Sequence, residues 1–158
     1  MRAKGSGTIL VVEDDSAIRG MLLEMLGECG YTVLPVGIAQ DAMVLIESTK
    51  QKIDLLIADV VMPGWSGPEL AKHFRAIRPG IPVLLISGHA AKTLSAHGVI
   101  PSDVNLLIKP FTSQTIARTV RDILADTGVT DNARRKIAPK PKKNTAGKGK
   151  KTGGKGKQ

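Results

Sequence analysis

The feature that most constrains the fold of this chain is an unbroken apolar run that ends in an acidic residue. Residues 55–58 are all apolar, and Asp59 follows them directly. A run without polar alternation predicts a strand covered on both faces, as in a parallel sheet. Asp59 would then lie at the carboxyl end of that strand, where open α/β folds place ligands. From this stretch alone, the alternative is an aspartate that only caps a loop.

The segment after Asp59 predicts a constrained loop and then a helix. Residues 62–64 (Met-Pro-Gly) break the strand, and Pro68 suits the first turn of the next helix. Asp59 would therefore be presented between a rigid strand and a constrained loop.

Strands and helices are predicted to alternate along most of the chain. Each predicted strand is a short apolar run, and each predicted helix has apolar residues at helical spacing. The strands are expected over residues 8–12, 31–36, 53–58, 82–86 and 104–108, and the helices over 16–28, 39–50, 68–77, 89–97 and 112–126. Right-handed crossovers between five such strands predict a doubly wound parallel sheet with helices on both faces.

Two residues in this pattern support finer predictions. Pro35 lacks a backbone N–H, so the second strand is expected near an edge of the sheet. In the third helix, Leu70, Phe74 and Ile77 recur at helical spacing, so all three are expected to face inward.

The positive charge of the chain is concentrated in its C-terminal segment. The sequence has 23 Lys+Arg and 14 Asp+Glu, and residues 134–158 hold 11 of the basic residues and no acidic residue. This segment has no aromatic residue and cannot bury enough apolar surface to offset its chain entropy. We therefore expect one folded domain over residues 8–127 and a disordered, Lys-rich tail over residues 128–158.

The basic tail has two interpretations. As a polyelectrolyte arm, residues 134–158 would bind nucleic acid with an affinity that falls steeply as salt rises. Such binding would be non-specific in sequence, because the tail offers no elements that read bases. Alternatively, the tail only increases solubility.

The remaining composition argues against secreted and membrane-spanning proteins. A single cysteine, Cys29, cannot form an internal disulfide, which fits a reducing compartment. The apolar runs are far too short to span a membrane, and the N-terminal run meets acidic residues at once, unlike a signal peptide. We expect a soluble, cytoplasmic protein.

Polar side chains follow four of the five predicted strands. Glu13 and Asp14 follow the first strand, Asp59 the third, Ser87 the fourth and Lys109 the fifth. These strand ends share one edge of a parallel sheet, so the side chains are expected to converge on one pocket. Crowded carboxylates repel unless a cation lies between them, and Mg²⁺ suits oxygen ligands of this kind.

Carboxylates, Mg²⁺, an ammonium group and a hydroxyl together form a site for a phosphoryl group. Asp59 can attack phosphorus as a nucleophile. The ion and Lys109 can neutralise charge on the equatorial oxygens, and Ser87 can hydrogen-bond the phosphoryl group once it is bound.

Four motifs in this order resemble the receiver domain of two-component response regulators. They are VVEDD at 11–15, DVVMPGWSG at 59–67, ISG at 86–88 and KPF at 109–111. The resemblance implies a flavodoxin-like sheet with strand order 2-1-3-4-5. It also implies phosphorelay signalling, with a histidine kinase or phosphotransfer protein as donor, altered partner binding as output, and no enzyme activity beyond self-phosphorylation and self-dephosphorylation.

The resemblance also implies a role for each residue of the predicted pocket. These roles are phospho-acceptor for Asp59, Mg²⁺ binding for Glu13, Asp14, Asp59 and the backbone carbonyl of Val61, switch hydroxyl for Ser87, and phosphate-binding ammonium for Lys109. The peptide bond between Lys109 and Pro110 is expected to be cis. Asp15, one place beyond the acidic pair, is expected to cap the first helix.

The sequence departs from the family's pattern at Leu106, where many receivers have Tyr or Phe. An aromatic rotamer switch is therefore not available to this chain. Val61, at the rim of the pocket, would give an attacking water no hydrogen-bond partner, so the phosphoryl group should persist. Trp65 is interpreted as a loop anchor, and His73, His89 and His97 as surface residues.

Three functional hypotheses follow from these patterns. The first is a stand-alone receiver that signals through altered partner binding, and the second is a nucleic-acid-associated regulator that acts through the basic tail. The third is a phosphatase with an aspartate nucleophile. Such phosphatases need a second aspartate two residues later, and Val61 at that position argues against this third hypothesis.

Overall fold

The computed structural model describes residues 5–88 and 104–128. Their helices and strands, in chain order, are β1 (Thr8–Val12), α1 (Ser16–Glu28), β2 (Thr32–Val36), α2 (Ala39–Ser48), β3 (Leu55–Asp59), α3 (Gly67–Ile77), β4 (Val83–Ser87), β5 (Asn105–Ile108) and α5 (Ser113–Gly128). Each of these elements was predicted from the sequence. The predicted helix over residues 89–97 and the tail beyond residue 128 lie outside the described residues.

The strands form one parallel sheet with the order β2-β1-β3-β4-β5. β1 pairs with β2 on one side and β3 on the other, and β4 pairs with β3 and β5. The predicted fold class and strand order are therefore confirmed. β2 lies at an edge of the sheet, as the position of Pro35 predicted.

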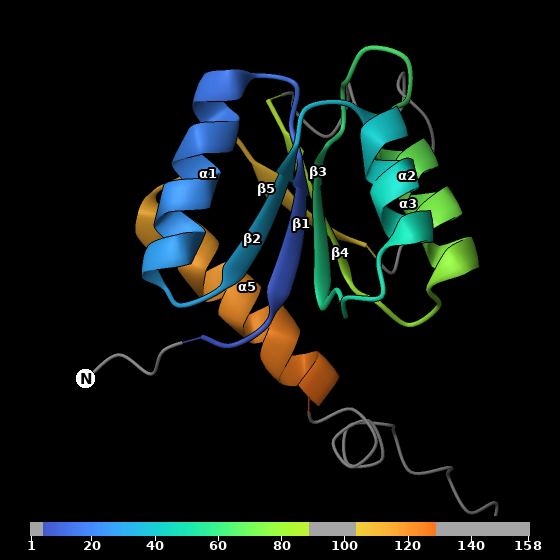
Figure 1. Cartoon of the computed structure of the whole chain (residues 1–158). Coiled ribbons are helices and arrows are strands. Elements are labelled where there is room, and N and C mark those ends of the chain that lie inside the picture. Colours follow the sequence, from blue (N-terminus) through green and yellow to red (C-terminus); the bar gives the residue numbers. More distant parts are fainter. Residues whose placement is uncertain (1–4, 89–103, 129–158) are drawn as a thin grey trace, which may run out of the picture. The chain divides into compact units, whose positions relative to one another are not determined.

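The helices cover both faces of the sheet, with α1 and α5 on one face and α2 and α3 on the other (Figure 1). Alternate residues of the central strands supply two separate cores. In β3, Leu55 and Ile57 pack with residues of α1 and α5, whereas Leu56 and Ala58 pack with residues of α2 and α3. Every residue of β3 is buried, which explains why this strand shows no polar alternation.

The start of α3 holds the loop after Asp59 close to β3. Ser66 and Glu69 form a capping box, in which each side chain accepts a hydrogen bond from the other residue's backbone N–H. The backbone N–H of Gly67 donates to the carbonyl oxygen of Val60 at 2.9 Å. A Cβ at position 67 would collide with the backbone of Asp59, so the close approach requires glycine.

Side chains cap the starts of α1 and α5. Asp15 caps α1 by accepting hydrogen bonds from the backbone N–H groups of Ala17 and Ile18, as predicted. At the start of α5, the hydroxyl of Thr112 accepts a hydrogen bond from the N–H of Thr115 at 3.1 Å. At the start of both helices, a local side chain therefore accepts hydrogen bonds from some of the free N–H groups.

The prediction that Ile77 faces inward was wrong. Leu70 and Phe74 are fully buried, whereas Ile77 is 42% exposed. Helical spacing places the three residues along one side of α3, but Ile77 is its last residue and does not belong to the core on that face. Helical spacing predicts the direction in which a side chain points. It does not predict where the helix extends beyond the core that it covers.

None of the helices in residues 5–88 and 104–128 combines the length and the apolar character needed to cross a bilayer.

Candidate functional site

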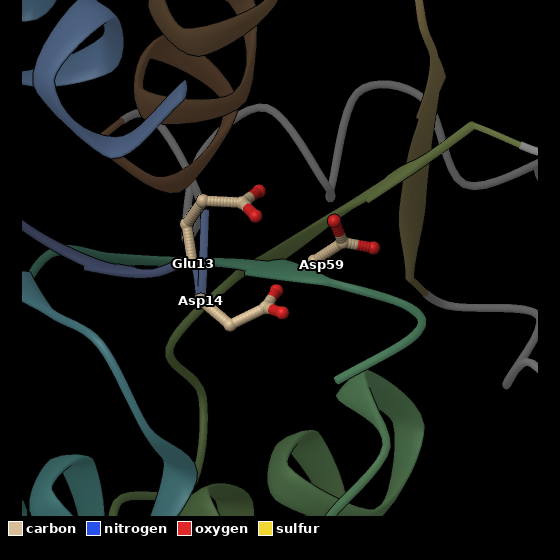
Figure 2. A group of neighbouring side chains, drawn as sticks. All are labelled: Glu13, Asp14 and Asp59. Atoms are coloured by element: carbon tan, nitrogen blue, oxygen red, sulfur yellow. The ribbon is translucent and has the colours of Figure 1, made fainter. Parts of the chain in front are cut away.

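Three carboxylates meet at the carboxyl edge of the sheet. Glu13 and Asp14 follow β1, and Asp59 is the last residue of the neighbouring strand β3. The Glu13 and Asp14 side chains extend toward the side on which Asp59 lies (Figure 2). One carboxylate oxygen from each residue lies within 4.8 Å of the other two. Glu13 and Asp59 are buried, and Asp14 is exposed.

Lys109 brings a positive charge to two of these carboxylates. Its Nζ lies 2.7 Å from Oδ2 of Asp59 and 3.4 Å from Oε2 of Glu13. Lys109 directly follows β5, and its backbone N–H donates to the carbonyl oxygen of Ser87 at 2.7 Å. The peptide bond from Lys109 to Pro110 is cis. The ends of β3, β4 and β5 are thus tied together around Asp59.

Backbone N–H groups fix the orientation of the two buried carboxylates. Oδ1 of Asp59 accepts a hydrogen bond from the N–H of Val61 at 3.0 Å, while Oδ2 faces Lys109. Oε1 of Glu13 accepts a hydrogen bond from the N–H of Asp15 at 3.2 Å, while Oε2 faces Lys109. One oxygen of each side chain is thus held by a backbone N–H and the other by Lys109.

The electrostatics of the cluster favour the binding of a cation. Burial, together with the negative charge of Asp59, raises the pKa of Glu13 to about 7, although the N–H of Asp15 and the charge of Lys109 act in the opposite direction. Burial lowers the pKa of Lys109, but its hydrogen bond to Asp59 and the charges of Asp59 and Glu13 outweigh burial and raise it overall. One ammonium group thus leaves the negative charge of three carboxylates incompletely compensated.

The donor set fits a divalent cation that prefers oxygen ligands. Carboxylate oxygens within 4.8 Å of one another suit Mg²⁺, which commonly binds through one or two carboxylates and several waters. Burial and the neighbouring charge of Asp59 raise the pKa of Glu13, so negative charge on this carboxylate needs compensation by nearby positive charge.

Ser87 lies at the same edge of the sheet. It is the last residue of β4 and is fully buried. Asp59 pairs in register with Ile86, so Ser87 stands one position further along the neighbouring strand. The position of Ser87 therefore agrees with the pocket expected from the strand ends.

The rim of the site includes Val61 and the loop that carries Trp65. Val61 is 38% exposed and contacts Asp59 through its backbone N–H. The rings of Trp65 and His73 pack at a centroid distance of 4.5 Å, and Trp65 also packs against the core under α2 and α3. This contact supports the interpretation of Trp65 as a loop anchor. His73 is exposed, and His89 and His97 lie outside the described residues.

Sequence reasoning missed Arg19. Its Nη1 donates to the backbone carbonyl oxygen of Glu13 at 2.7 Å and lies 3.4 Å from that of Asp14. The sequence signal that could have identified Arg19 is its positive charge in the first turn of α1, where the helix macrodipole disfavours positive charge.

Comparison with known proteins decides the family of this chain. The family model of the response regulator receiver domain matches residues 9–121. The chain belongs to this family. As a receiver domain, it is a component of phosphorelay signal transduction in two-component systems.

Receiver domains with similar sequences occur in proteins of very different length. The sensor kinase CckA of Brucella abortus is 32% identical over 120 residues, which are 76% of this chain and 13% of CckA. The response regulator receiver protein CpdR of the same organism is 31% identical over 116 residues, which are 73% of this chain and 95% of CpdR. The chain spans 48% of another relative, the uncharacterised transcriptional regulatory protein YrkP of Bacillus subtilis.

Solved receiver structures share the fold. The receiver domain of a hybrid histidine kinase CckA is 36% identical with a TM-score of 0.64, and the match covers 75% of this chain and 99% of that domain. A receiver protein from Sinorhizobium medicae is 29% identical with a TM-score of 0.68, and the match covers 77% and 97% of the two chains.

Proposed function

We propose that this receiver accepts a phosphoryl group on Asp59, in a reaction that depends on Mg²⁺, and signals by altered binding to a partner. The donor in this proposal is a histidine kinase or a phosphotransfer protein, and the compartment is the cytoplasm. The observation that carries the proposal is the position of Asp59, which lies 2.7 Å from Lys109 within the cluster of three carboxylates.

Each residue of the cluster has a role in the proposed transfer. Glu13, Asp14, Asp59 and the backbone carbonyl of Val61 would hold Mg²⁺, which supplies positive charge to the phosphoryl oxygens when bound. An oxygen of Asp59 attacks phosphorus in line while the phosphorus–nitrogen bond of a phosphohistidine breaks, and the imidazole nitrogen keeps the bonding electron pair.

Lys109 and Ser87 act on the transferred group. Lys109 already contacts Oδ2 of Asp59, so a small movement of its ammonium group would bring it to a phosphoryl oxygen. The hydroxyl of Ser87 would donate a hydrogen bond to another phosphoryl oxygen. These contacts would couple phosphorylation of β3 to the ends of β4 and β5. The chemistry proposed for the chain is limited to its own phosphorylation and dephosphorylation.

The fluorescence of Trp65 provides a test, because this residue lies in the loop after Asp59 and is the sole tryptophan. Titration with Mg²⁺ and then with beryllofluoride, a mimic of the phosphoryl group, is expected to change the emission in two saturable steps. Asp59→Asn should lose the second step. Asp15→Asn is a matched control, since Asp15 lies beside the acidic pair but caps α1, and asparagine caps equally well. A beryllofluoride response that survives in Asp59→Asn would contradict the proposal.

Binding of nucleic acid by residues 134–158 stays a prediction. These residues lie outside the described part of the chain, and the family match ends at residue 121. The comparisons favour phosphorelay signalling over this alternative.

A further inference from the structure

We propose that Arg19 is a positioning residue of the metal site. In this proposal, its guanidinium group holds the backbone of Glu13 and Asp14 so that their carboxylates face the bound cation. The inference rests on the proposed function of the acidic cluster. Its direct observation is the pair of contacts from Nη1 to the carbonyl oxygens of Glu13 and Asp14, at 2.7 Å and 3.4 Å.

Helix stability does not explain the placement of Arg19. α1 begins at Ser16, after the cap residue Asp15, so Arg19 lies in the first turn. A positive charge there opposes the helix macrodipole, which favours acidic residues at this end. The side chain instead reaches back to the two residues that precede the cap. Departures from such helix preferences are expected at residues that serve a functional site.

The backbone of Glu13 is held on both sides. Its N–H donates to the carbonyl oxygen of Val36 in β2 at 3.1 Å, and its carbonyl oxygen accepts from Arg19. Its carboxylate is further fixed by the N–H of Asp15. Arg19 thus adds to the set of contacts that orients Glu13, and its longer contact extends the restraint to Asp14.

The guanidinium group also fits closely against the loop between β2 and α2. A Cβ placed on Gly37 would lie 3.3 Å from Nη1 of Arg19, which is tighter than an ordinary contact. The absence of a side chain at position 37 therefore leaves the space that Arg19 occupies. Gly37→Ala would require the guanidinium group to shift by a few tenths of an ångström while keeping its charge.

Positioning and simple charge effects predict opposite results for Mg²⁺ binding. A guanidinium group near a cation site repels the cation, so removal of its charge alone would strengthen Mg²⁺ binding. If Arg19 orients the ligands, its removal would weaken Mg²⁺ binding in spite of the lost repulsion. The sign of the change separates the two roles.

Calorimetric titration of the full chain with Mg²⁺ tests the proposal. Arg19→Met is expected to weaken binding by about tenfold, at the lower end of the range for groups that orient metal ligands. Arg19→Lys should recover part of the affinity, because an ammonium group can still donate to a backbone carbonyl but ends one bond short of the position of Nη1. Gly37→Ala should weaken binding by a smaller factor, and it provides a second variant should Arg19→Met fail to fold.

Arg78 offers a matched control. It also donates from its guanidinium group to backbone carbonyl oxygens, those of Ile46, Thr49 and Gln51, but these precede the amino end of β3, at the opposite edge of the sheet from Asp59. Arg78→Met is expected to lower the melting temperature and to leave the Mg²⁺ affinity unchanged.

Three results would overturn the role of Arg19. They are an Arg19→Met protein that binds Mg²⁺ as tightly as the wild type or more tightly, a Gly37→Ala protein with unchanged affinity, and an equal loss in Arg78→Met. Failure of the wild type to bind Mg²⁺ would instead overturn the proposed function and this inference together.

Discussion

At the scale of single residues, burial of Glu13 beside Asp59 lowers the stability of the protein at neutral pH. The carboxylate of Glu13 is buried at 2% exposure next to Asp59, and its pKa is raised to about 7 from an ordinary value of 4.5. The folded protein therefore binds this proton more tightly than the unfolded chain does. In the absence of a cation, this group lowers stability as the pH rises from 4.5 to about 7, and the loss is complete above that range.

Glu13→Gln is therefore expected to stabilise the metal-free protein at pH 8. The gain should be roughly 1 to 3 kcal/mol, because one pKa unit corresponds to about 1.4 kcal/mol. It should disappear near pH 4, where Glu13 is protonated in both the folded and the unfolded state. Chemical denaturation with a chelator present measures this difference. A variant that is less stable than the wild type at pH 8 would show that Glu13 is not destabilising.

Val61 bears on how long phosphorylation of Asp59 lasts. Its side chain lies exposed at the rim of the site and offers no hydrogen bond to an attacking water. Val61→Asn would add one such bond of about 1 kcal/mol, which corresponds to roughly fivefold faster dephosphorylation. The decay of the phosphorylated protein after removal of the phosphodonor measures this rate. A slower decay in Val61→Asn would refute the proposed effect.

At the scale of helices and strands, the loop between β3 and α3 is held by a close backbone approach. Gly67→Ala would place a Cβ against the backbone of Asp59 and is expected to cost about 1 to 3 kcal/mol of stability. Gly20→Ala, at an exposed position of α1 with no atom within 4 Å of the added Cβ, is the control and should stabilise by up to about 1 kcal/mol.

Thermal or urea denaturation compares the two glycine variants. Gly67→Ala should also slow phosphorylation, because the displaced backbone belongs to Asp59. If Gly67→Ala were as stable as Gly20→Ala, the close approach would not constrain this loop.

The helices and strands could be predicted from the sequence where the pattern of apolar residues matches the surface that the element buries. The apolar run over residues 55–58 predicted β3 because both faces of this strand are covered by helices. The prediction that Ile77 faces inward was wrong, since helical spacing does not show where a helix extends beyond the core. The contact between Trp65 and His73 depends on the path of a loop, which no periodic pattern encodes.

At the scale of the whole molecule, the parallel sheet explains why residues distant in sequence form one site. All four strands that supply polar residues run in the same direction, so their carboxyl ends lie at one edge. The convergence of Glu13, Asp14, Asp59 and Lys109 could therefore be predicted from strand ends alone. The contacts of Arg19 could not, because they depend on where one guanidinium group lies relative to two backbone carbonyls.

Mass spectrometry after incubation with acetyl phosphate and Mg²⁺ tests the central claim most directly. We predict a base-labile phosphoryl adduct on the peptide that contains Asp59, absent when Mg²⁺ is removed and absent in Asp59→Asn. A protein that gains no adduct under these conditions, or gains one on Asp14 or Asp15 instead, would contradict the account.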